Sequence, residues 1–107
     1  MAKYHMRFFF DWGSRVCLWA NSKETEEEYD YPIDALLLPI SDELKVFLDK
    51  LIYWHDEALN WDDPAGDFLW TQKQIEKFKE AAKDGYNKLC AELAPDYEIT
   101  FEEQLII

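Results

Sequence analysis

The sequence predicts an α+β fold, in which a mostly antiparallel sheet carries a two-helix hairpin on one face, in the order β-β-β-α-α-β. Two observations support this prediction. Segments near both ends of the chain alternate apolar and polar residues with the period of a strand, whereas the region between them repeats apolar residues with the period of a helix. A chain of 107 residues has room for one hydrophobic core, so we expect a single domain over residues 1–107.

The first third of the chain is expected to form three strands. Residues 3–10 (KYHMRFFF) alternate with period two, and residues 16–20 (VCLWA) form a second β-branched and aromatic run. Gly13 in the short segment between them indicates a hairpin. Residues 21–30 are polar and acidic and are predicted to be a loop. A third, short strand follows, which Pro32 would confine to an edge or a bulge.

Two helices are expected next. Ser41 is a good N-cap for a helix over roughly 42–59, whose apolar residues recur at i, i+3, i+4 and i+7. Thr71 and Gln74 have the spacing of a capping box, so a second helix should begin there and run to about Leu93.

The second helix contains one residue that needs a packing explanation. Gly85 costs about 1 kcal/mol relative to alanine inside a helix, which indicates close packing or a local bend. Pro95 should end the helix, and residues 96–102 alternate again as a last strand.

The composition restricts the classes of partner. The chain carries 23 acidic residues against 11 basic ones, a formal net charge of -12, which repels nucleic acid and anionic lipid and attracts cations.

No apolar run approaches the ~18 residues of a membrane span, and the N-terminal residues lack a signal-peptide pattern. Cys17 and Cys90 show no CxxC spacing, so we expect free thiols. We therefore expect a cytoplasmic protein that binds neither nucleic acid nor membrane.

Motifs for catalysis or metal binding are not recognisable in the sequence. His55 lies on the apolar stripe of its helix, where a core histidine is more common than a catalytic one. The chain has no GxSxG, P-loop or GxGxxG motif, and no Cys/His cluster for zinc. A calcium loop counted from Asn60 fails, because Ala65 stands where glycine is needed and Thr71 where glutamate is needed. We expect neither an enzyme nor a cofactor.

The acidic residues gather in two short segments. Residues 21–34 carry six carboxylates against Lys23 alone, and residues 56–67 carry five with no basic residue. Like charges that gather in loops repel each other, but they speed association with a basic partner. We predict that this partner is bound by Glu26, Glu27, Glu28 and Asp30 in the first segment and by Asp56, Glu57, Asp62 and Asp63 in the second.

Aromatic residues adjoin the second segment. With five Trp, six Tyr and seven Phe, the chain has more aromatic side chains than a small core needs. Trp61, with Trp54 before it, has the composition of an interface hot spot ringed by charge. Trp61 is equally well explained as a plug that closes the core. Trp70 is explained by a hydrophobic staple at the start of the second helix.

Three segments resemble a known group of proteins. They are MRFFFDWGSRVCLWA, LNWDDPAGDFLWTQKQIEKFKEAA and LAPDYEITF, and they span most of the chain. The pattern resembles small acidic bacterial proteins, several of which are immunity proteins of polymorphic or contact-dependent growth-inhibition toxin systems. Its most distinctive piece, L-N-W-D-x-P…W-T, is formed by Leu59, Asn60, Trp61, Asp62, Pro64, Trp70 and Thr71.

The resemblance implies a stoichiometric inhibitor that binds a cognate toxin domain in the cytoplasm of the producing cell. Such toxins are commonly basic nucleases, which suits an inhibitor of net charge -12. Immunity surfaces vary freely, so the resemblance assigns no binding residue. Two other functions stay open: a small-ligand-binding or enzymatic domain with a pocket near His55, and a nucleic-acid mimic. The oligomeric state also stays open, with a monomer favoured.

Overall fold

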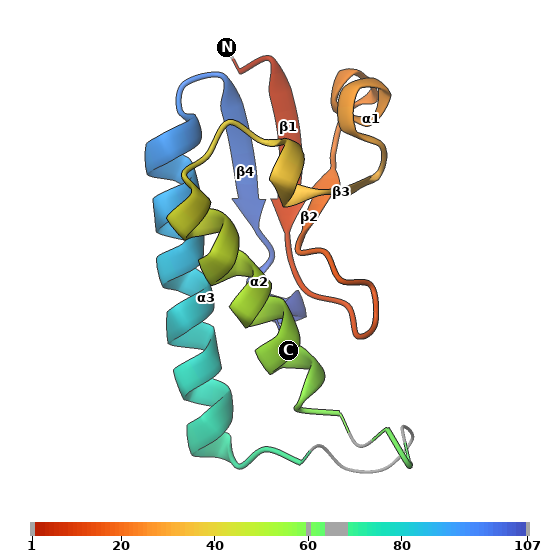
Figure 1. Ribbon diagram of the computed structural model, residues 1–107, viewed down its shortest axis with the longest axis vertical. Helices are drawn as coiled ribbons and strands as arrows, with labels where there is room; N and C mark the ends of the chain where they lie inside the picture. The colour runs from red at the N-terminus through yellow and green to blue at the C-terminus, as the bar shows by residue number, and fades with distance from the viewer. Residues whose placement is uncertain (1, 60, 64–68, 107) are drawn as a thin grey trace.

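The computed structural model describes residues 2–59, 61–63 and 69–106, and these confirm the α+β class (Figure 1). The elements follow in the order β1 (Tyr4–Phe8), β2 (Leu18–Ala20), α1 (Lys23–Tyr29), β3 (Pro32–Ile33), η1 (Ala35–Leu37), α2 (Asp42–Asp56), α3 (Gln72–Leu93), β4 (Tyr97–Phe101) and η2 (Glu103–Leu105). The two η elements are short 3₁₀-helices.

The sheet has the strand order β3-β2-β1-β4 and is mixed rather than purely antiparallel. β1 pairs antiparallel with β2, and β2 with β3, whereas β1 and β4 are parallel. The reason is the path of the helices: α2 runs down one face and α3 runs back, which returns the chain to the end of the sheet where β1 begins (Figure 1). There Lys3 N donates to Asp96 O at 2.9 Å. β3 lies at an edge, as Pro32 predicts.

The core lies between the sheet and the hairpin of α2 and α3. Fully buried side chains from every layer meet there, among them Met6, Phe8, Leu18, Leu48, Leu51, Phe78 and Leu89. Gly85 lies at a close approach of the two helices, because a Cβ placed on it would lie 3.1 Å from Leu51 Cδ1 and 3.3 Å from Phe47 Cε2. The close packing expected at this glycine is therefore confirmed. Ile106 near the C-terminus is also fully buried.

The prediction that residues 21–30 form a loop is wrong, since α1 occupies Lys23–Tyr29. A local cap and a hydrogen bond to β1, rather than an apolar stripe, stabilise this helix. Ser22 is its N-cap and accepts from Thr25 N, while the fully buried Thr25 accepts from His5 N on β1 at 2.9 Å. A single buried residue gives no periodic apolar signal, so the sequence pattern did not reveal the helix.

The connection from β1 to β2 is also longer than the predicted turn. It spans residues 9–17, with Gly13 at φ 79° and Arg15 at φ 65°. This connection lies beside the C-terminal end of α2 (Figure 1), which stops at Asp56 rather than near residue 59. The start of α3 agrees with prediction, because Thr71 and Gln74 form both hydrogen bonds of a capping box.

Candidate interaction surface

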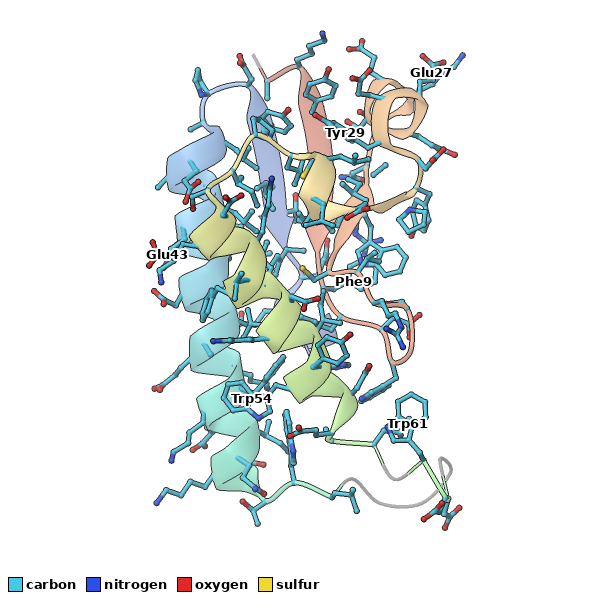
Figure 2. The ribbon with its side chains drawn as sticks, in the orientation of Figure 1. Phe9, Glu27, Tyr29, Glu43, Trp54 and Trp61 are labelled. Carbon is cyan, nitrogen blue, oxygen red and sulfur yellow. The ribbon has the colours of Figure 1, made fainter. Side chains whose placement is uncertain are left out.

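The first acidic segment is displayed on α1. Glu26, Glu27 and Glu28 are exposed on this helix, and the exposed Asp30 follows it with φ 69°. Figure 2 shows Glu27 pointing away from the body of the molecule. Within the described part of the chain, no salt bridge joins any of these four carboxylates to a basic side chain. α1 therefore holds its negative charge facing solvent, on a helix anchored to β1 through Thr25.

The second acidic segment begins with a carboxylate that has a structural partner. Asp56 is half-buried, and its Oδ1 accepts from Gly13 N at 3.2 Å, which ties the β1–β2 connection to the end of α2. Glu57, Asp62 and Asp63 are exposed. Asp67 lies outside the described residues, as do Asn60 and Pro64 of the L-N-W-D-x-P motif.

The two acidic segments lie far apart. The molecule measures 42 × 23 × 23 Å, and α1 lies near one end of its long axis while the segment after α2 lies at the other (Figure 1). Figure 2 places Glu27 and Trp61 at these opposite ends. The structure therefore does not bring the two predicted sets of carboxylates into one patch.

Trp61 does not fill the core. Its side chain is 55% exposed, and its Nε1 donates to Asp56 O at 2.9 Å. Its Cη2 lies 3.6 Å from the position that a Cβ on Gly13 would take, so the ring rests on the β1–β2 connection. Trp54 is half-buried and lies among aromatic rings instead, 5.9 Å from Trp70 and 5.2 Å from Phe78 between centroids.

His55 is buried, with only 1% exposure. Its ring stacks against Phe10 at 5.2 Å and Trp12 at 4.7 Å between centroids, and among the described residues its Nε2 has no hydrogen-bond partner. Burial lowers the pKa of His55 to about 4, against the opposing effect of Asp56 and Asp11. The side chain is therefore neutral at pH 7 and packed as a core residue, which argues against a catalytic role for His55.

An apolar groove that the sequence reasoning missed lies between η1, the β1–β2 connection and α2. Its volume is about 260 Å³, and its floor is formed by buried Cys17, Ile33, Leu48 and Ile52. Burial raises the pKa of Cys17 to about 12, so the thiol is a neutral part of this floor. Exposed Leu36 and Val46 stand at its rim, together with Asp34 and Asp49. The sequence signal for an exposed apolar surface here is the run Leu36–Leu37–Leu38, because one short turn cannot bury three consecutive leucine side chains.

The described residues form neither a metal-binding cluster nor a membrane-spanning helix. Among the residues with described positions, no group of three or more His, Cys, Asp or Glu side chains could hold a metal ion. None of the described helices combines the length and apolar character needed to cross a bilayer. The two described cysteines are free thiols.

The comparison with known proteins agrees with the resemblance in the sequence. No curated protein matches the chain significantly. One family model, described as Serratia CdiI immunity protein-like, matches residues 4–104. The match includes all four strands, both long helices, α1 and the groove beside η1. The chain belongs to the Serratia CdiI immunity protein-like family.

Proposed function

We propose that this protein is an immunity protein that binds a cognate toxin domain, a basic nuclease, and neutralises it in the cytoplasm of the producing cell. The observation that carries the proposal is the family match over residues 4–104. Inhibition is stoichiometric, by coverage of the toxin, and requires no chemistry from the inhibitor. The buried, neutral His55 suits a protein that acts by binding alone.

The charge of the chain supports a basic partner. A nuclease binds phosphates through Lys and Arg, so the groove that holds its substrate is positively charged. An inhibitor of net charge -12 is attracted to the same groove. The exposed carboxylates of α1 are suited to this role, because no salt bridge within the described residues neutralises them.

The test is a titration of the toxin encoded beside this protein. We expect nuclease activity to fall linearly and to vanish at one equivalent of the protein. The dissociation constant should rise steeply between low and high salt, because the attraction between exposed charges is screened. An unrelated protein of similar size and charge serves as the control and should not inhibit. Absence of binding at low salt would overturn the proposal.

A further inference from the structure

We propose that the groove between η1 and α2 receives an apolar side chain of the toxin, with Lys or Arg residues of the toxin on either side of it. This inference rests on the proposed function, since it names the surface through which the toxin is bound. The sequence predicted a contact through the two acidic segments. The groove instead places the centre of the contact on apolar residues that lie between these segments.

The first support is the exposed apolar surface beside the groove. Leu36 and Leu37 on η1 are 68% and 63% exposed, whereas the next residue, Leu38, is 2% exposed. On α2, Val46 and Tyr53 are 54% and 52% exposed, and their spacing of seven residues puts them on one side of the helix. Neighbouring exposed apolar side chains are typical of interaction sites on soluble proteins.

The second support is the size and chemistry of the cavity. Its volume is about 260 Å³, and its floor is apolar. For comparison, an engineered apolar cavity of about 150 Å³ holds a benzene molecule. The groove can therefore accept a side chain as large as leucine, methionine or phenylalanine. A side chain that fills such a pocket at the centre of a contact carries much of the binding energy.

The third support is the placement of charge around the groove. α1 lies toward one end of the long axis and residues 57–59 and 61–63 toward the other, with η1, which lines the groove, between them (Figure 1). Asp34 and Asp49 stand at the rim itself. Arg15 and Lys45 also line the groove, where Arg15 Nη1 donates to Tyr53 Oη at 3.3 Å and Lys45 Nζ lies 4.0 Å from Asp42, so the excess of negative charge comes from the two acidic segments. An apolar centre with a charged rim is the usual anatomy of a protein interface.

A larger depression of about 690 Å³ between the start of α2 and the end of α3 is less suited to a partner. Its aromatic floor is covered, because Lys88 Nζ lies 4.6 Å from the centroid of the Phe47 ring. Glu92 in the same depression is engaged by Ser41, whose N and Oγ donate to it at 2.6 and 3.0 Å. Four of its lining side chains are thus already paired with each other.

The test compares two leucines of similar exposure. The affinity of the purified toxin is measured for the wild-type protein, for Leu36→Asp at the groove and for Leu69→Asp, where the leucine is 61% exposed outside the groove. We expect Leu36→Asp to weaken binding at least about thirtyfold, the loss typical of a central contact residue. Leu69→Asp should stay within about threefold. An added carboxylate attracts a basic partner, so a loss at Leu36 reports the apolar contact.

Val46→Asp is a second groove variant, on α2 instead of η1, and should show the same loss. Circular dichroism verifies that each variant is folded. If the wild-type protein does not bind the toxin, the proposed function fails. If the wild-type protein binds and both groove variants bind within threefold of it, the function stands and the groove inference is overturned. Equal losses for Leu36→Asp and Leu69→Asp would overturn it as well.

Discussion

The imidazole of His55 stacks on the indole of Trp12, with 4.7 Å between ring centroids and 23° between planes, while Trp12 Nε1 donates to His55 O at 3.0 Å. Phe10 covers the imidazole as well, at 5.2 Å. The β1–β2 connection is thus fixed to the end of α2 by a histidine packed between aromatic rings, and protonation of that histidine would put a charge into a buried site.

The stability of the protein should decrease as the pH is lowered, because of His55. Its pKa is about 4 in the folded protein and 6.5 in a model peptide, so below pH 6.5 the unfolded chain binds a proton that the folded chain does not. His55 should therefore lower the free energy of unfolding by about 3 kcal/mol in total as the pH falls from about 6.5 to 4. Below pH 4 the contribution of His55 should level off. Urea unfolding at pH 7, 5.5 and 4 measures it.

The control for this prediction is His55→Gln, which does not titrate. The difference in unfolding free energy between the wild-type protein and His55→Gln should shrink by about 3 kcal/mol on going from pH 7 to pH 4. Parallel pH profiles for the two proteins would show that His55 is not the group responsible.

Gly85→Ala should destabilise the protein despite the better helix propensity of alanine. The new methyl group would lie 3.1 Å from Leu51 Cδ1, closer than ordinary van der Waals contact, and Leu51 is only 1% exposed within the core. Overpacking of this kind costs about 1–3 kcal/mol, which exceeds the gain of about 1 kcal/mol from propensity. Asn87→Ala, at an exposed position of the same helix, is the control and should be neutral or slightly stabilising. A more stable Gly85→Ala protein would contradict the close packing of α2 and α3.

The position of α1 should depend on Thr25. Its Oγ1 accepts from His5 N at 2.9 Å and lies 2.8 Å from Ser22 Oγ, in a fully buried site. Thr25→Val keeps the shape but leaves the amide of His5 without this partner, which should cost about 1–3 kcal/mol. Thr100→Val, at an exposed position of β4, is the matched control and should change stability by less than about 0.5 kcal/mol. Equal effects at the two positions would show that α1 is not held by this hydrogen bond.

Features that depend on neighbouring residues were predictable from the sequence. The capping box of Thr71 and Gln74 and the close packing at Gly85 follow from local patterns, and both are present. The stripe of α2 likewise identified His55 as a residue of the interior. Such features could be predicted because each is fixed by residues a few positions apart.

Features that depend on distant contacts were not predictable in the same way. α1 is stabilised by a hydrogen bond that His5 N on β1 donates to Thr25 Oγ1, twenty residues away, and the parallel pairing of β1 with β4 depends on the return path of α3. The exposure of Leu36 was likewise not predictable, because a run of leucines has no periodicity that indicates which of them faces the core. The groove could therefore be located only once η1 and α2 were placed side by side.

The contribution of α1 to toxin binding can be separated from that of net charge. One double variant carries Glu27→Lys and Glu28→Lys on α1, and the other carries Glu76→Lys and Glu80→Lys on α3. The two variants change the net charge by the same amount, and all four glutamates are exposed. If the toxin approaches α1, the first pair should slow association by about tenfold at low salt, because steering depends on the charges nearest the contact.

The α3 pair should slow association much less, and the difference between the pairs should fade as salt is added. Stopped-flow measurement of the association rate at two salt concentrations provides the comparison. Equal slowing by both pairs would mean that the toxin senses the overall charge of the molecule rather than a surface on α1. In that case the apolar groove beside η1 would be the part of the surface that sets the orientation of the complex.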